Sequence, residues 1–285
     1  MIITNNLNLP SALVEAVSTD RHNKNGQYSA TTLLKGTCET ILMKRHWNEI
    51  KTDVSENIWQ IFGTAVHLIF EKQKDNSFKE EFFAVDVSNS KVTGRVDSYD
   101  MENETIVDWK TASVWKVQFK DFSDWKRQGV IYAWLLKKNG LNVKKCRFIA
   151  LLKDHSKSKA RFDASYPQSP VYVYESAVKE KDLEEIEKFI KEKVRNLEES
   201  EKVDDEKLSP CTADERWATE GKWKAKKEGR KTALKVCDTE EEAKAVIKDI
   251  TGGYVEYVAG SSKKCIDYCS CKEFCPFYKK KIENK

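Results

Sequence analysis

The stretch from Val92 to Thr111, which reads VTGRVDSYDMENETIVDWKT, constrains the fold of this chain most strongly. Strand-forming residues lie on both sides of the turn-like run MENE, whose asparagine suits a bend, and this pattern predicts a β-hairpin. If residues 101–104 form the loop, Asp97 lies directly opposite Asp108. Because side chains alternate along a strand, the lysine two residues after Asp108 shares its face, and the tryptophan between them points the other way.

Two carboxylates that face each other across a hairpin repel, which is destabilising unless a positive charge lies between them. A hard divalent cation such as Mg²⁺ or Mn²⁺ meets that condition, because it binds oxygen ligands. Such a cation polarises a phosphoryl oxygen and lowers the pKa of a bound water, while Lys110 orients that water or offsets charge in the transition state. The hairpin is therefore a candidate site of phosphodiester hydrolysis. Taken alone, the same residues are more typical of an exposed charged hairpin.

A second candidate element precedes the hairpin. The run DVSE at residues 53–56 predicts a helix start with an acidic cap, and the apolar residues that follow it indicate a largely buried helix. Gly63, His67 and Glu71 recur every four residues, so they share one helix face, where the glycine permits a close approach. An isolated histidine on such a helix is usually a packed or capping residue.

A third element follows the hairpin. Residues 121–138 predict an amphipathic helix that ends before Asn139 and Gly140. Gln128 and Tyr132 lie one turn apart in this helix and face the same way. Outside this context, such a pair is typical of a polar helix stripe with a tyrosine hydroxyl at the surface.

Together these elements carry four short motifs. In chain order they are G-x-x-x-H ending at His67, G-x-x-D ending at Asp97, D-W-K-T starting at Asp108, and Q-x-x-x-Y ending at Tyr132. The series resembles the PD-(D/E)xK nuclease superfamily, in particular its branch of RecB-like, AddB-like, Cas4-like and phage-type exonucleases. Four weak motifs in the right order on the right kinds of element support one another.

The resemblance implies a fold, an activity and a set of site residues. The expected fold is α/β, a restriction-endonuclease-like core in which a mixed central sheet is flanked by helices. The expected activity is that of a Mg²⁺- or Mn²⁺-dependent deoxyribonuclease. The resemblance assigns metal binding to His67, Asp97, Asp108 and the carbonyl of Trp109, with Glu71 as a weaker candidate. It assigns positioning of the attacking water to Lys110, and support of the DNA strand and the active site to Gln128 and Tyr132.

The 285 residues suit one large core with an appended module. Residues 1–28 are expected to form an N-terminal extension with a loop at 22–26. Residues 29–200 are expected to form the nuclease core, with the element order α-β-β-β-α-β-β-α. After the acidic linker at 198–206, residues 201–285 are expected to form a small α/β module that is basic and rich in cysteine.

The net charge of +4 is too small to indicate a nucleic-acid binder by itself, so any basic surface must be local. Residues 222–235 are the candidate segment, because they contain seven Lys or Arg against one Glu, interleaved with Trp223. Such a segment suits contact with the phosphates and bases of a single strand. The alternative is a solvated basic strand or loop.

Eight cysteines are many for a cytoplasmic chain, in which structural disulfides are rare. The tail reads Cys265-x3-Cys269-x-Cys271-x3-Cys275-Pro276, which indicates thiolate ligation of a metal, although the C-x2-C pairs of zinc ribbons are absent. The tail resembles the [4Fe-4S] staple of RecB-like nucleases, with zinc as the alternative, but its spacing departs from the common C-x2-C-x5-C. The resemblance implies the ligands Cys211, Cys265, Cys269 and Cys275, with Cys38 or Cys271 as alternative members. Strand positions predict that the other two cysteines, Cys146 and Cys237, are small hydrophobic residues.

The resemblance implies an exonuclease that acts at DNA ends or on single strands in phage or bacterial recombination or repair. A helicase or a single-strand-annealing protein is the expected kind of partner, and the expected location is the cytoplasm of a bacterial or phage-infected cell. No apolar run is long enough for a membrane span. Two other classes stay open: a non-catalytic DNA-binding module with a structural metal cluster, and a zinc-stabilised interaction protein.

Overall fold

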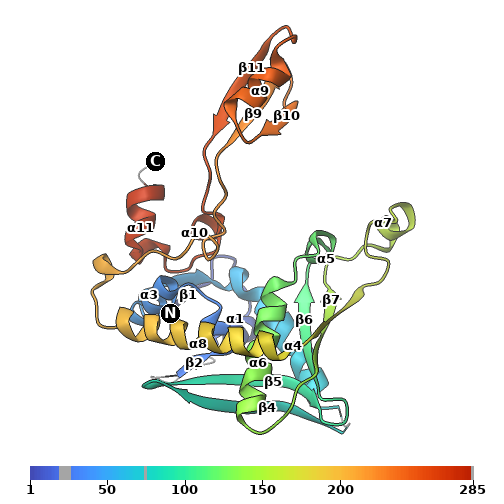
Figure 1. The fold of residues 1–285 in the computed structure, drawn as a ribbon, viewed down its shortest axis with the longest axis vertical. Coiled ribbons are helices and arrows are strands. Elements are labelled where there is room, and N and C mark those ends of the chain that lie inside the picture. The colour runs from blue at the N-terminus through green and yellow to red at the C-terminus, as the bar shows by residue number, and fades with distance from the viewer. Residues whose placement is uncertain (19–26, 74–75, 284–285) are drawn as a thin grey trace.

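The computed structural model describes residues 1–18, 27–73 and 76–283, so the loop expected at 22–26 lies outside the described residues. Its centre is a six-stranded mixed sheet in the order β2-β5-β6-β7-β8, with β4 paired to β5 (Figure 1). Strand β6 runs antiparallel to β5 and parallel to β7. The strands are β2 (Gln27–Ser29), β4 (Ser77–Val87), β5 (Ser90–Asp100), β6 (Thr105–Ala112), β7 (Lys145–Leu152) and β8 (Val171–Ala177). The predicted mixed sheet, its hairpin and the hairpin loop at 101–104 are confirmed.

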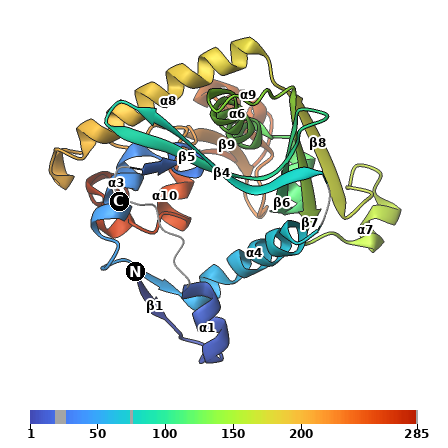
Figure 2. The ribbon, with the colours of Figure 1, turned by 90° about the horizontal axis from the view of Figure 1, so that it is seen from below.

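Helices lie on both sides of this sheet. Figure 2 shows α4 on the opposite side of β4 and β5 from α6 and α8. The helices of the core are α2 (Ala30–Leu33), α3 (Thr37–Arg45), α4 (Ile58–Glu71), α5 (Val114–Phe119), α6 (Ser123–Lys138), α7 (Lys157–Phe162) and α8 (Glu180–Ser200). Gly36 separates α2 from α3 as the N-cap of α3. None of the helices in the described part of the chain is long and apolar enough to cross a membrane.

Helix α6 packs very closely against the sheet, because glycines stand at the contact points on both the strand and the helix. A Cβ atom added at Gly94 of β5 would lie 2.6 Å from Leu135 Cδ1 and 3.0 Å from the Tyr132 ring. A Cβ atom added at Gly129 of α6 would lie 2.8 Å from Phe148 Cζ. The glycine of the G-x-x-D motif therefore sets the distance between β5 and the helix that carries Tyr132.

The burial expected for α4 is wrong. Val66 is the buried residue of this helix, whereas Trp59, Phe62, Leu68 and Ile69 are exposed. The helix has the apolar composition of a core helix, but it packs on β5 and β6 along one face and makes only a small contact with α1, so these side chains stay accessible. The close approach expected at Gly63 is also absent, since a Cβ atom there would make an ordinary 3.7 Å contact with Thr111 Oγ1.

The N-terminal segment adds a small two-stranded parallel sheet to the body. Strand β1 (Ile2–Thr4) pairs with β3 (Lys51–Asp53), and α1 (Ser11–Ser18) lies between them in sequence. Asp53 accepts a hydrogen bond from Ser55 N and thereby caps the 3₁₀ turn η1 (Val54–Asn57) that leads into α4. The helix start predicted from the run DVSE is confirmed.

After the 3₁₀ turn η2 (Asp205–Lys207), the chain forms a projecting arm and then returns to the body (Figure 1). The arm consists of β9 (Lys222–Lys227), β10 (Lys235–Cys237), α9 (Glu240–Ile247) and β11 (Gly253–Val258). The tail consists of α10 (Lys263–Asp267), η3 (Lys272–Phe274), α11 (Pro276–Tyr278) and η4 (Lys279–Glu283). The arm has a small core of its own, whereas the tail packs against the main core through Cys271 and its neighbours. The division into regions 1–28, 29–200 and 201–285 stays a prediction.

The two motif glycines predict opposite effects on stability. Gly94→Ala should lower the free energy of unfolding by about 1–3 kcal/mol, because its methyl group overpacks the interface with α6. Gly63→Ala should raise it by about 0.5–1 kcal/mol, because alanine favours a helix interior and the space is open. Urea denaturation followed by circular dichroism measures both. A stabilising Gly94→Ala would contradict the close packing of α6 on β5.

Candidate active site and thiol cluster

The backbone pairing of the β5–β6 hairpin ends just before Asp97 and Asp108. Its ladder has the predicted register from Asp100↔Thr105 to Ser98↔Val107 and ends there. The next position on β5 is Asp97, which does not continue the ladder; its Oδ2 accepts a hydrogen bond of 2.8 Å from Trp109 N. The Asp97 carboxylate thus accepts from Trp109 N in place of a backbone carbonyl of β5. This hydrogen bond joins the first acidic motif to the second.

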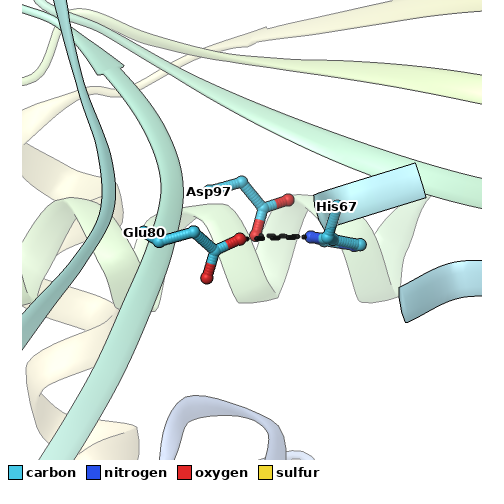
Figure 3. A group of neighbouring side chains, drawn as sticks. All are labelled: His67, Glu80 and Asp97. Atoms are coloured by element: carbon cyan, nitrogen blue, oxygen red, sulfur yellow. Dashed lines mark ion pairs between the residues drawn. The ribbon is translucent and has the colours of Figure 1, made fainter. Parts of the chain in front are cut away.

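A glutamate on the other neighbouring strand joins Asp97. The pairs Lys79↔Ser98 and Glu81↔Val96 flank Glu80, so the register places Glu80 opposite Asp97. The φ angle of Glu80 is 51°, a left-handed conformation that is costly for a residue with a side chain. Strain of this kind concentrates at functional sites, and here it coincides with an acidic side chain that points at a second carboxylate (Figure 3).

His67 of α4 completes this acidic group, which we call the metal-site triad: His67, Glu80 and Asp97. His67 Nδ1 lies 3.3 Å from Asp97 Oδ1 and 3.6 Å from Glu80 Oε1 (Figure 3). The three ligand atoms lie within 4.8 Å of one another. Hydrogen bonding to Asp97, and then to Glu80, raises the pKa of His67 to about 10, against the opposing effect of burial. A protonated imidazole offsets one of the two carboxylate charges, and a metal ion would have to displace its proton to bind Nδ1.

The second acidic motif lies inside the protein. Asp108 is 2% exposed, and burial raises its pKa to about 6, with a further contribution from the charge of Asp97, although Lys110 acts in the opposite direction. Lys110 Nζ lies 2.6 Å from Asp108 Oδ2, as expected from the alternation of side chains along β6. Among the described residues, Asp108 Oδ2 is the buried side-chain oxygen that accepts no hydrogen bond, so Lys110 faces it as an ion pair.

Lys110 is held by Asp108 of β6 and also by helix α6. Lys110 Nζ donates a hydrogen bond of 2.8 Å to Gln128 Oε1, and Gln128 Nε2 donates one of 3.0 Å to the Tyr132 hydroxyl. Burial raises the pKa of Tyr132, so its hydroxyl stays protonated. The residues of D-x-K and Q-x-x-x-Y are therefore one connected chain of contacts, which is a physical reason for their spacing on β6 and α6.

Trp109 lies next to Asp108 and Lys110 in β6, but its side chain points to the opposite face of the sheet. Its indole ring stacks on Phe70 of α4, with ring centroids 3.9 Å apart, so it points away from Lys110 as the hairpin pattern predicted. This stacking fixes α4 over β6 and brings His67 toward Asp97. Glu71, the weaker candidate ligand, is exposed at the end of α4 and lies outside the metal-site triad. Sequence reasoning missed Glu80, which looks like any acidic strand residue until the register puts it opposite Asp97.

The donor set fits a hard divalent cation. Three carboxylates and one imidazole meet at the end of the β5–β6 ladder, and one buried carboxylate oxygen lacks a donor. Oxygen-rich sites of this kind bind Mg²⁺ or Mn²⁺, and a cation would offset the repulsion between Asp97 and Asp108.

A family model described as the PD-(D/E)XK nuclease superfamily matches residues 10–276, which is most of the chain. The chain belongs to this nuclease superfamily. Its mixed sheet flanked by helices agrees with the restriction-endonuclease-like fold of the superfamily. No curated protein matches the sequence.

Solved structures that match this nuclease do so at low identity. One is SSO0001, with 16% identity, a TM-score of 0.46, and coverage of 64% of this chain and 83% of that chain. A phage-related exonuclease from Haemophilus somnus has 12% identity and a TM-score of 0.36, and the match covers 66% of this chain and 93% of that one. LHK-Exo in complex with dAMP has 11% identity and a TM-score of 0.33, with coverage of 61% and 89%. The family assignment rests on the family model.

Six of the eight cysteines gather where the tail meets α3. The Cys38 thiol is in hydrogen-bonding contact with the thiols of Cys211 and Cys275. Cys269 Sγ lies 3.6 Å from Cys271 Sγ, and burial next to the Cys269 thiol raises the pKa of Cys265 to about 11. All eight cysteines are free, so this thiol cluster (Cys38, Cys211, Cys265, Cys269, Cys271 and Cys275) contains no disulfide. The other two cysteines are buried strand residues, as predicted: Cys146 on β7 and Cys237 on β10.

Ion pairs fix the thiol cluster to the body. Lys264 Nζ lies 2.6 Å from Glu39 Oε2, which joins the residue before Cys265 to the residue after Cys38. Lys193 of α8 lies 2.7 Å from Glu215 Oε1, and Glu215 Oε2 accepts a hydrogen bond from Thr212 N, next to Cys211. Gly36 leaves room for this loop, since a Cβ atom there would lie 2.4 Å from Cys211 Sγ. Both upstream cysteines therefore reach the tail thiols.

The metal-site triad predicts that Glu80, and not Glu71, contributes to cation binding. Glu80→Gln should weaken Mn²⁺ binding by at least about tenfold, the loss usual even for residues that only support a ligand. Glu71→Gln is the matched control, because it removes an equal charge from the end of α4, and it should bind Mn²⁺ like the wild type. Isothermal titration calorimetry measures both affinities. Equal losses in the two variants would contradict the grouping of Glu80 with His67 and Asp97.

Proposed function

We propose that this nuclease is a Mg²⁺- or Mn²⁺-dependent DNA exonuclease that acts at DNA ends or on single strands. The observation that carries the proposal is the meeting of the metal-site triad with the contact chain from Asp108 through Lys110 and Gln128 to Tyr132. A binding module has no chemical need for a lysine held beside a buried carboxylate. The superfamily of the chain supports the same conclusion.

His67, Glu80, Asp97 and Asp108 would hold the cation, with the carbonyl of Trp109 as a further ligand. When bound, the cation supplies Lewis acidity toward a phosphoryl oxygen and lowers the pKa of water. Asp97 keeps its orientation through the hydrogen bond from Trp109 N. Asp108 presents Oδ2, the oxygen that lacks a donor, from a rigid central strand.

Lys110 is the residue that would position the attacking water. An ammonium group has three N–H donors, and Lys110 donates to Gln128 and pairs with Asp108 as an ion pair, so it can still donate to a water or a phosphate oxygen. Its positive charge also offsets the charge that develops on the phosphoryl group. Gln128 and Tyr132 hold Lys110 in place and would steady the DNA strand over α6.

The proposed setting is phage or bacterial recombination or repair, with a helicase or a single-strand-annealing protein as partner. These assignments rest on the family resemblance of the four motifs. All the proposed contacts reach the phosphate and the metal, so cleavage independent of sequence is expected.

Degradation of end-labelled linear DNA beside a covalently closed circle tests the activity. In Mg²⁺ or Mn²⁺ the linear single- or double-stranded form should disappear while the circle persists, and EDTA should stop the reaction. Asp108→Asn should slow it by roughly a thousandfold, because a bound cation contributes several kcal/mol to lowering the barrier. An intact linear substrate under every metal, with folded wild-type protein, would contradict the proposal and favour a binding module.

We further propose that Cys211, Cys265, Cys269 and Cys275 ligate a [4Fe-4S] cluster that fastens the tail to the body. These four thiols are the partly exposed members of the thiol cluster, whereas Cys38 and Cys271 are buried. A hydrogen bond from Cys38 lowers the pKa of Cys275 to about 6, and thiolates are the form that binds iron or zinc. The contact of Cys38 with Cys211 and Cys275 makes Cys38 the alternative ligand.

Absorption and metal content test this cluster. Anaerobically purified protein should be brown, with absorption near ~400 nm and bound iron, as expected for thiolate-ligated iron. Cys275→Ser should lose the colour and the iron, and Cys237→Ser, in the separate core of the arm, should keep both. Colourless protein with stoichiometric zinc would contradict the iron cluster, and protein without either metal would contradict a ligand role for these thiols.

A further inference from the structure

The arm that projects from the body has one covered face and one open face. Its three strands lie in the order β10-β9-β11, and α9 packs on one side through the small core of Ala225, Cys237 and Ala243. Because side chains alternate along a strand, Lys222, Lys224 and Lys226 of the central strand point to the other side. We call this side the basic face; in the described chain, α9 is the helix in extensive contact with this sheet.

Aromatic and aliphatic side chains lie among these lysines. The register sets Tyr254 opposite Lys226, Glu256 and Val236 on either side of Lys224, and Val258 opposite Lys222. Tyr254 is 42% exposed and Val236 is 54% exposed, and Lys226 Nζ lies 5.7 Å from the centre of the Tyr254 ring. Exposed apolar side chains between the lysines are not expected if this strand is only solvated, and they indicate a binding surface.

Charge is segregated between the two sides of the arm. Residues 222–235 contain seven basic residues and one acidic residue, whereas the first turn of α9, on the covered side, contains Glu240, Glu241 and Glu242. Lys226 pairs with Glu256, and Lys222 pairs with Asp238. Among the described residues, no ion pair neutralises Lys224, which lies between these two pairs on the basic face. An excess of positive charge on one face is complementary to a polyphosphate backbone.

We propose that the basic face of the arm binds single-stranded DNA. The lysines would contact successive phosphates, and Tyr254 would stack on an unpaired base. A duplex keeps its bases stacked inside, so it has no use for an exposed tyrosine on a flat sheet, and this favours a single strand over a duplex. As an assignment of where the substrate strand is held, the proposal rests on the proposed nuclease function.

The base of the arm is suited to carry the strand toward the body. The two chain segments that enter and leave the arm are joined by a bridge between Ala218 and Ser262 and by the hydrogen bond Thr219 N to Ser261 O of 2.9 Å. Next to this bridge, Trp217 is 51% exposed and Tyr268 is 60% exposed, with ring centroids 5.3 Å apart. Exposed aromatic rings thus occur both on the arm and at its base.

Binding of a labelled oligothymidylate in EDTA tests this face without requiring catalysis. Fluorescence anisotropy of a strand of about 30 nucleotides, longer than one typical single-strand site, compares two charge-matched variants. Lys224→Gln with Lys226→Gln removes two charges from the basic face, and Lys244→Gln with Lys248→Gln removes two from α9 and its C-cap. The first variant should bind about tenfold more weakly at physiological salt, with a salt slope lower by about 1.4, because each phosphate contact contributes roughly 0.7. The α9 variant should match the wild type.

Tyr254→Ala tests the stacking contact, and it should weaken binding of the single strand by roughly tenfold while leaving binding of an equally long duplex unchanged. Thermal melting of each variant establishes that the arm is folded. Equal binding by the two charge-matched variants, or equal loss for single strand and duplex in Tyr254→Ala, would overturn the proposal. Asp108→Asn separates the two claims, because it should bind the strand like the wild type even though it does not cleave.

Discussion

A buried negative charge on the central strand of the sheet governs the site. Asp108 is 2% exposed on β6, and its partner Lys110 lies 2.6 Å away. Such a charge is stable in a protein interior only when a cation compensates it, and breaking such a pair leaves an uncompensated charge at a cost of about 3–5 kcal/mol. The raised pKa of Asp108 shows that Lys110 compensates it incompletely. The site therefore favours an additional positive charge, which a divalent metal ion would supply in the proposed function.

The surrounding elements follow from this requirement. On one side, α6 packs closely through Gly94 and Gly129 and holds Lys110 through Gln128. On the other side, α4 is fixed by the stacking of Phe70 on Trp109 and brings His67 to the acidic groups. Ion pairs also position the thiol cluster, holding it against α3 and α8.

Much of this arrangement follows from local sequence patterns. The hairpin loop at 101–104, the end of α6 at Lys138 and the spacing of Gln128 and Tyr132 depend on neighbours in the chain, and all agree with the structure. Features that depend on tertiary contacts were not accessible in this way. The apolar pattern of α4 cannot reveal that Trp59, Phe62, Leu68 and Ile69 stay exposed. Glu80 becomes a candidate ligand only through the register of β4 on β5. The sequence placed the thiols near one another in the tail, but the approach of both Cys38 and Cys211 requires the folded body.

The most direct test of the central claim is the position of a bound cation. Crystals soaked with Mn²⁺ and measured near the manganese absorption edge would give an anomalous difference peak at each manganese ion. The account predicts a peak within coordination distance of Asp108 Oδ2 and of the Asp97 carboxylate, beside Glu80 and His67. No peak at this position in an accessible, Mn²⁺-saturated site, or a peak ligated only by other residues, would contradict it.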